Sequence, residues 1–134
     1  MSAKSAHPHP RPTAGSSGAL VCCSSGLHHL EIRDGHDRLA AEFGDQGLAS
    51  NTLWPRTFIG TSALRIADPA MAQRSRTPQI MADAAYRILT RPSREATGQA
   101  YLDEMVLRDA GITDFSGYAV DPAQEPEIDW FVPS

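Results

Sequence analysis

Histidine and cysteine, the usual ligands of zinc, gather in the first 30 residues. They are His7, His9, Cys22, Cys23, His28 and His29. Their spacing matches no standard zinc arrangement, and the surrounding sequence offers no scaffold that would fix a tetrahedral site. We therefore expect no metal site. Adjacent cysteines rarely meet disulfide geometry, so this pair does not indicate an oxidising compartment.

Two groups of carboxylates have the chemistry of general acids or bases. They are Asp103 with Glu104, and the tail residues Asp121, Glu125, Glu127 and Asp129. Both groups lie in sequence that looks exposed, so we expect solvated surface charge. Trp130 and Phe131 end the acidic tail, and such an aromatic pair is suited to an interface.

Polar side chains lie in and just after the apolar segment Leu48–Trp54. Asn51, Thr57 and Thr61 could aim hydrogen-bonding groups at a ligand, as loops that leave parallel strands do. They could equally satisfy backbone groups near the strand end. The residues alone leave both interpretations open.

The elements that must position these residues begin near position 36. Residues 36–47 are predicted to form a helix, because Leu39, Ala40 and Phe43 share one face. Leu48–Trp54 is predicted to be a short buried strand that Pro55 ends.

Two further helices begin where a capping residue precedes a proline, at Asp68 and at Thr77. The second, which ends at Arg91, is the strongest helix prediction. Its apolar stripe consists of Met81, Ala84, Ala85, Ile88 and Leu89. A strand over residues 98–102 and a helix over residues 104–110 are predicted to follow.

Residues 1–35 differ in composition from the rest of the chain. They are dense in proline, glycine and serine, and only Leu20 and Val21 make a short apolar pair. Such a segment cannot bury enough surface to offset its ordering entropy. We predict a disordered N-terminal segment with at most a turn over residues 27–34, and one structured unit over residues 36–134.

Alternating helices and strands predict an α/β fold with a parallel sheet. Two strands are too few for such a sheet, so we expect the C-terminal portion of a larger, doubly wound one. The net charge of −4 across 134 residues favours neither nucleic acid nor an anionic membrane as partner. With no apolar run near about 20 residues and no secretory signal, a soluble, cytoplasmic protein is expected.

Three stretches, residues 39–43, 51–57 and 76–86, resemble one branch of the short-chain dehydrogenases/reductases. That branch includes citronellol/citronellal-type dehydrogenases and hydroxysteroid dehydrogenase-like proteins. The likeness covers roughly residues 39–121 with almost no gaps. It implies a Rossmann-like sheet with the cofactor, NAD or NADP, outside the carboxyl ends of the strands. The implied activity is oxidation or reduction of small apolar alcohols or carbonyl compounds.

The resemblance also implies where the cofactor binds. Leu48–Trp54 would be the sixth strand of the family, and the loop after it contacts the nicotinamide carboxamide. The matching candidates for cofactor binding are Asn51, Pro55, Thr57, Ile59 and Thr61. Arg56 replaces the glycine that is usual in the family, a departure that this branch shares. Residues 62–75 would cover the substrate.

Two parts that the family needs for hydride transfer are missing from the sequence. No glycine-rich turn follows a predicted strand to hold the pyrophosphate. The family's Tyr-x-x-x-Lys pair, in which lysine lowers the tyrosine pKa, precedes the sixth strand. The only lysine here is Lys4, and the tyrosines Tyr86, Tyr101 and Tyr118 all follow that strand. We therefore predict no catalytic residues and an enzyme fragment that is inactive alone.

An alternative is a non-catalytic α/β remnant that acts as an interaction partner of a full-length relative. It would associate with that relative, or with a second copy, through an exposed sheet edge. The two hypotheses differ in whether the chain binds a nicotinamide cofactor.

Residues 20–37 occupy the place of the family's catalytic helix. A shift of one nucleotide in their degenerate codons permits tryptophan at position 20, phenylalanine at 21, tyrosine at 27 and lysine or arginine at 31. We therefore hypothesise that this segment is an out-of-frame reading of the catalytic helix. Nucleotide sequence with incompatible codons would end the hypothesis.

Overall fold

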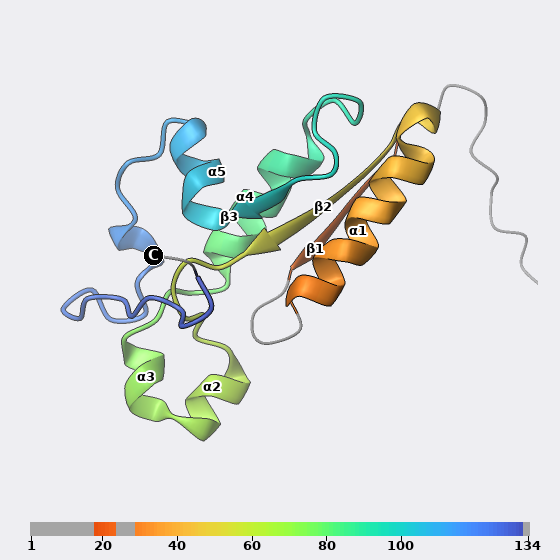
Figure 1. Ribbon diagram of the computed structural model, residues 1–134. Helices are drawn as coiled ribbons and strands as arrows, with labels where there is room; N and C mark the ends of the chain where they lie inside the picture. The colour runs from red at the N-terminus through yellow and green to blue at the C-terminus, as the bar shows by residue number, and fades with distance from the viewer. Residues whose placement is uncertain (1–17, 24–28, 133–134) are drawn as a thin grey trace, which may run out of the picture.

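A three-stranded parallel sheet forms the centre of the structure, a computed structural model that describes residues 18–23 and 29–132 (Figure 1). Its strands are β1 (Gly18–Cys23), β2 (Leu48–Trp54) and β3 (Ala100–Leu102), in the order β1-β2-β3. Strand β2 is therefore central and pairs in parallel with both neighbours. The predicted α/β parallel-sheet fold is confirmed.

Strand β1 corrects the prediction of low order for residues 18–23, which lie within the first 35 residues. It pairs with β2 from Gly18, opposite Leu48, to Cys23, opposite Leu53. Its own residues signal a strand only weakly, and its partner lies some 30 positions further along the chain. Because its own strand propensity is low, β1 is stabilised by its pairing with β2 and by the contact of Val21 with the core. Residues 1–17 and 24–28 lie outside the described residues.

Helix α1 (His29–Phe43) begins seven residues before the helix that the pattern predicts. The expected domain boundary at residue 35 falls inside it. A short 3-10 helix, η1 (Gly44–Gln46), completes the turn into β2. His36 Nδ1 lies 2.6 Å from Ser50 Oγ on β2, and Ser50 is fully buried. Packing against the sheet therefore extends the helix beyond what local propensity indicates.

The other face of the sheet packs against α4 (Gln79–Leu89) and α5 (Asp103–Asp109). Because side chains alternate along a strand, Leu53 faces this side while Ser50 faces α1. The core cluster consists of Leu53, Ile80, Ala84, Ile88, Val106, Leu107 and Phe115. Leu89, predicted to belong to the apolar stripe of α4, is instead 45% exposed, and Ile80 takes a buried place.

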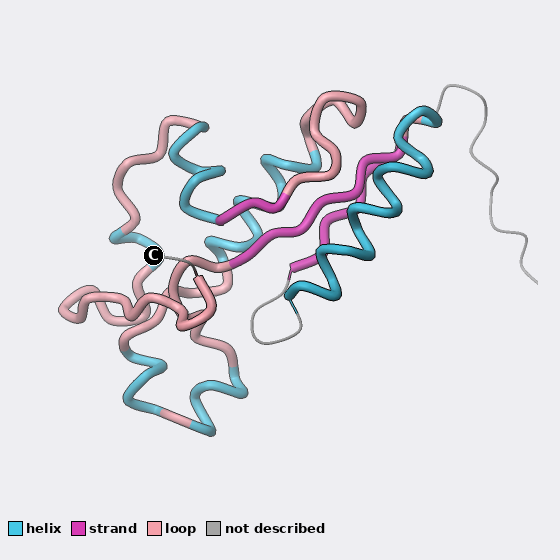
Figure 2. Tube along the Cα trace, viewed as in Figure 1, coloured by secondary structure: helices cyan, strands magenta, loops and turns pink. Residues whose placement is uncertain are grey.

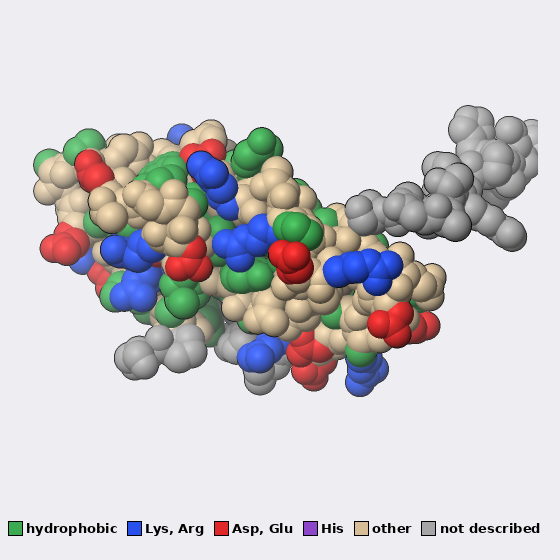
Figure 3. All heavy atoms as spheres, turned by 90° about the horizontal axis from the view of Figure 1, so that it is seen from above, with side chains coloured by type: hydrophobic (Ala, Val, Ile, Leu, Met, Phe, Trp, Pro, Cys, Tyr) green, Lys and Arg blue, Asp and Glu red, His purple; other side chains and the backbone are tan. Residues whose placement is uncertain are grey.

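Loops and two short helices gather at the carboxyl end of β2 (Figure 2). The helices α2 (Ser62–Ala67) and α3 (Pro69–Gln73) project away from the sheet. The predicted cap at Asp68 is confirmed, since its side chain accepts a hydrogen bond from the Met71 amide at 2.9 Å. Seen from above, acidic and basic side chains intermingle on the surface (Figure 3). Within the described ranges, no helix has the length and apolar character needed to cross a membrane.

Candidate functional site: the loop after the central strand

A pocket of about 220 Å³ lies at the carboxyl end of β2. It is lined by Pro55, Phe58, Ile59, Thr61, Leu64, Asp129 and Phe131. Three of the five predicted cofactor-binding residues, Pro55, Ile59 and Thr61, therefore meet in one cavity. The carboxyl end of a parallel strand is where α/β folds place their ligands.

Thr61 combines a structural contact with a free donor. Its Oγ1 accepts a hydrogen bond from the Leu64 amide at 3.2 Å and caps α2. A hydroxyl has one donor besides its acceptor sites, so the O–H of Thr61 remains free to donate to a ligand.

Thr57 lies between the pocket-lining residues but faces the interior. It is 3% exposed, and its Oγ1 has no hydrogen-bond partner among the described residues. Its backbone forms an antiparallel bridge with Ile128 of the C-terminal tail. An unsatisfied buried hydroxyl costs free energy and is available to a new partner.

Asn51, the fifth predicted residue, lies apart from the pocket, in the middle of β2. Its Nδ2 donates to the Ala96 carbonyl at 2.8 Å, and its Oδ1 accepts from the Gln99 amide at 3.1 Å. The side chain is 1% exposed. Its amide therefore satisfies backbone groups of the turn before β3, which is the structural alternative that the sequence left open.

The tail supplies pocket residues that sequence reasoning did not single out. Asp129 and Phe131 line the wall opposite the loop, although the sequence suggested only surface charge and an interface aromatic. Asp129 is 6% exposed. The signal in the sequence was the alternation of polar and apolar residues from Glu127 to Trp130, which is typical of an extended segment.

A buried charge cluster at the start of α5 corrects the prediction of solvated charge there. Glu104 pairs with Arg76, with Arg56 at 3.5 Å and with Arg108 at 3.3 Å. Phe115 lies under two guanidinium groups, with ring-centroid distances of 5.2 Å for Arg76 and 4.8 Å for Arg108. The cluster ties the loop after β2 to α5 and to the C-terminal region.

Asp103 precedes Glu104 and is fully buried. Its Oδ1 accepts from the Arg56 amide at 3.0 Å and the Glu104 amide at 2.7 Å. Burial raises the pKa of Asp103, while these two amides and Arg76 act in the opposite direction. The carboxyl therefore anchors the backbone at the mouth of the loop.

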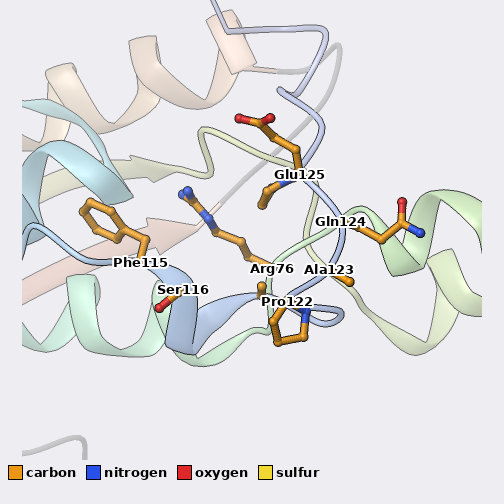
Figure 4. A pocket seen from close by; sticks show the side chains of 9 residues that line it. Arg76, Phe115, Ser116, Pro122, Ala123, Gln124 and Glu125 are labelled. Carbon is orange, nitrogen blue, oxygen red and sulfur yellow. The ribbon is translucent and has the colours of Figure 1, made fainter.

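A second pocket, of about 400 Å³, lies beside this cluster (Figure 4). Figure 4 shows Arg76 extending between the Phe115 ring and the segment from Pro122 to Glu125. Arg76 is ion-paired with Glu104 and only 9% exposed, so it presents little cationic surface to a ligand in this pocket. We assign it no function.

No cluster of three or more candidate metal ligands occurs in the part of the chain that the structure describes. Cys22 and Cys23 are free thiols on β1. Three of the histidines considered above, His7, His9 and His28, lie outside the described residues.

Two solved dehydrogenase structures match this chain. A short chain dehydrogenase from Mycobacterium thermoresistibile superposes with a TM-score of 0.77 at 34% identity, over 90% of this chain and 49% of that one. This chain therefore shares the fold of about half of that short chain dehydrogenase. A putative dehydrogenase from Xanthomonas campestris matches with a TM-score of 0.70 at 48% identity, over 76% of this chain and 38% of that one. Residues 36–134 make up about three quarters of the chain, so the match over 90% includes residues before position 36.

The sequence is also similar to curated dehydrogenase-like proteins. Hydroxysteroid dehydrogenase-like protein 2 of Xenopus tropicalis is 42% identical over 86 residues, which are 63% of this chain and 20% of that protein. The Homo sapiens protein of the same name is 37% identical over 95 residues, which are 70% and 22%. No family model matches the chain.

The chain thus spans about a fifth of the length of these curated relatives. They support the hydroxysteroid dehydrogenase-like side of the resemblance and do not test its citronellol dehydrogenase side. The likeness is to dehydrogenases, which are oxidoreductases.

Proposed function

We propose that this chain forms the C-terminal part of an NAD(P)-dependent oxidoreductase domain for small apolar alcohols or carbonyl compounds. In this proposal it holds the nicotinamide end of the cofactor but cannot by itself complete hydride transfer. The observation that carries the proposal is the pocket at the end of β2, in which Pro55, Ile59 and Thr61 meet.

The residues of the pocket fit a nicotinamide better than a phosphate. Its walls are mainly apolar, from Pro55, Phe58, Ile59, Leu64 and Phe131, and suit a flat ring. The free O–H of Thr61 can donate to the carboxamide oxygen. Among the described residues that line the pocket, none is cationic and Asp129 is acidic, so a pyrophosphate would be repelled.

A bound nicotinamide would supply the hydride chemistry, and the residues of this chain would orient it. The backbone near Pro55 is fixed by the bond between the Arg56 amide and Asp103. Helix α2 begins at the pocket rim and, with α3, corresponds to the predicted substrate cover. On α2, Ile66 is 85% exposed, which suits contact with an apolar substrate.

Proton transfer is the step that residues 1–134 do not provide. Residues 29–37 of helix α1 belong to the segment that the resemblance assigns to the catalytic helix, and position 31 carries glutamate rather than lysine. Position 27, where the family has tyrosine, carries leucine and lies outside the described residues.

Thr61 gives a direct test of cofactor binding. Thr61→Val is expected to weaken NADH or NADPH binding by about tenfold, because it removes a hydrogen bond to the carboxamide. Thr61→Ser keeps the hydroxyl and should bind within about twofold of the original chain. Dissociation constants come from isothermal titration. The absence of any cofactor binding by the unmodified chain would contradict the proposal.

The second candidate function is that of a non-catalytic interaction partner, and the exposure of β1 favours it. Leu20 is 46% exposed, and within residues 18–23 and 29–132 strand β1 pairs on one side only. The strand contains no charge or proline of the kind that protects natural sheet edges. We propose that this edge pairs with a full-length relative, or in the purified protein with a second copy.

Ala19→Pro tests this edge. The Gly18 amide donates to Gly47, on the β2 side, so the alternating amide of Ala19 faces the free edge. Proline there removes an edge donor while the pairing with β2 stays intact. We expect the original chain to elute as a dimer or larger species and Ala19→Pro to shift toward the monomer, with Ala19→Ser as control. A monomeric original chain with a sharp cooperative melt would refute the edge pairing.

A further inference from the structure

The C-terminal tail is held along the loop that carries the candidate cofactor residues. The Phe58 amide donates to the Glu127 carbonyl at 3.1 Å, and the Asp129 amide donates to the Arg56 carbonyl at 3.0 Å. Glu127 is fixed in turn by its ion pair with Arg74 at 2.5 Å. The tail therefore pairs with the loop through an isolated antiparallel bridge between Thr57 and Ile128 and has a defined position.

The side chains of tail residues 128–131 lie alternately outside the pocket and in its lining. Asp129 and Phe131 line the pocket. Ile128 and Trp130 point away and are 50% and 73% exposed. Trp130 also contacts the Phe58 ring edge-on, with 5.4 Å between the ring centroids. A turn follows Ile128, in which the Val132 amide donates to the Asp129 carbonyl at 3.2 Å, and this turn brings Phe131, which is 37% exposed, to the pocket.

Asp129 presents a hydrogen-bond acceptor that its own surroundings do not use. Its Oδ1 accepts from the Phe131 amide at 3.0 Å. No hydrogen bond within the described residues reaches its Oδ2, although the residue is only 6% exposed. A carboxylate held in such a site attracts a donor and a positive charge more strongly than one in water.

We propose that Asp129 and Phe131 form the second wall of the nicotinamide pocket and bias it toward the oxidised ring. This inference rests on the proposed function. The carboxamide of nicotinamide has an acceptor, which Thr61 can serve, and an NH2 donor, which Asp129 can serve. The oxidised ring carries a positive charge that the reduced ring lacks, so the carboxylate favours the oxidised form. Phe131 supplies an aromatic surface against the ring.

Two small probes isolate this effect from the rest of the dinucleotide. Nicotinamide is neutral and 1-methylnicotinamide is a cation, and both carry the same carboxamide. Each is titrated into the 134-residue chain, and binding is followed by the NMR shifts of the amides of Phe58, Ile59, Thr61 and Phe131. We expect the cation to bind about tenfold more tightly than the neutral probe, as befits one charge-assisted contact.

The variants separate the roles of the two tail residues. Asp129→Asn keeps the size and the acceptor for Phe131, and it should abolish the preference for the cation. Phe131→Ala should weaken both probes by a similar factor, and Phe131→Leu serves if the alanine variant does not fold. Ile128→Ala changes a tail side chain that points away from the pocket. It is the matched control and should leave both affinities unchanged.

The outcomes distinguish this inference from the function on which it rests. If the loop amides respond but Asp129→Asn keeps the cation preference, the role of Asp129 is refuted and the proposed function stands. If Phe131→Ala binds like Ile128→Ala, the tail is not a wall of the pocket. If neither probe shifts any of these amides, both the inference and the nicotinamide pocket fail.

Discussion

Glu104→Gln is expected to lower the free energy of unfolding by about 3–5 kcal/mol, the usual cost of removing one partner from a buried ion pair. Glu104 and Arg76 are 6% and 9% exposed, so solvent cannot replace the lost charge. The Arg76 guanidinium would remain buried over the Phe115 ring without its carboxylate. Urea unfolding followed by circular dichroism measures the change.

Two further variants make this result specific. Glu125→Gln removes an exposed carboxylate and should change stability by less than about 0.5 kcal/mol. The double variant Arg76→Met with Glu104→Leu removes both charges and should be much less destabilised than Glu104→Gln, because no buried charge is left unpaired. A loss below about 1 kcal/mol in Glu104→Gln would show that the cluster is not buried as described.

Asn51→Ala is expected to cost about 2–6 kcal/mol of stability, because it leaves two backbone groups without partners at about 1–3 kcal/mol each. These are the Ala96 carbonyl and the Gln99 amide. Gln99→Ala is the control, since it keeps the backbone amide and removes only an exposed side chain. The same unfolding experiment measures both variants.

The affinity of folded Asn51→Ala for NADH adds a second readout. The pocket residues Pro55, Ile59 and Thr61 lie after the strand end, whereas Asn51 lies within it, so affinity should stay within about twofold. A large loss of cofactor affinity with little change in stability would assign Asn51 to the site instead.

The sequence pattern correctly predicted the elements that can be recognised from their own residues alone. Strand β2 has the bounds expected from its apolar run, and α4 differs from its prediction only in the terminal turns. The loop after β2 follows the strand directly, so the resemblance could place Pro55, Ile59 and Thr61 near one another. Their meeting in a cavity is a consequence of chain adjacency.

Contacts between distant segments account for what the sequence pattern missed. Strand β1 depends on pairing with β2, and its six residues alone do not indicate which segment it pairs with. The burial of Glu104 requires arginines from positions 56, 76 and 108, which only the folded chain brings together. The tail wall likewise depends on pairing across some 70 residues, between Thr57 and Ile128. Single-residue burial preferences therefore gave the wrong environment for Asp103, Glu104 and Asp129.

The most direct test of the account is a steady-state assay of the purified 134-residue chain with NAD+ or NADP+ and a series of small apolar alcohols. A complete short-chain dehydrogenase in the same assay confirms that the conditions support turnover. Reduction of the cofactor is expected only at the rate of the protein-free blank, because the sequence contains no Tyr-x-x-x-Lys pair to take the proton. Sustained, alcohol-dependent formation of NADH or NADPH by the chain alone would contradict it.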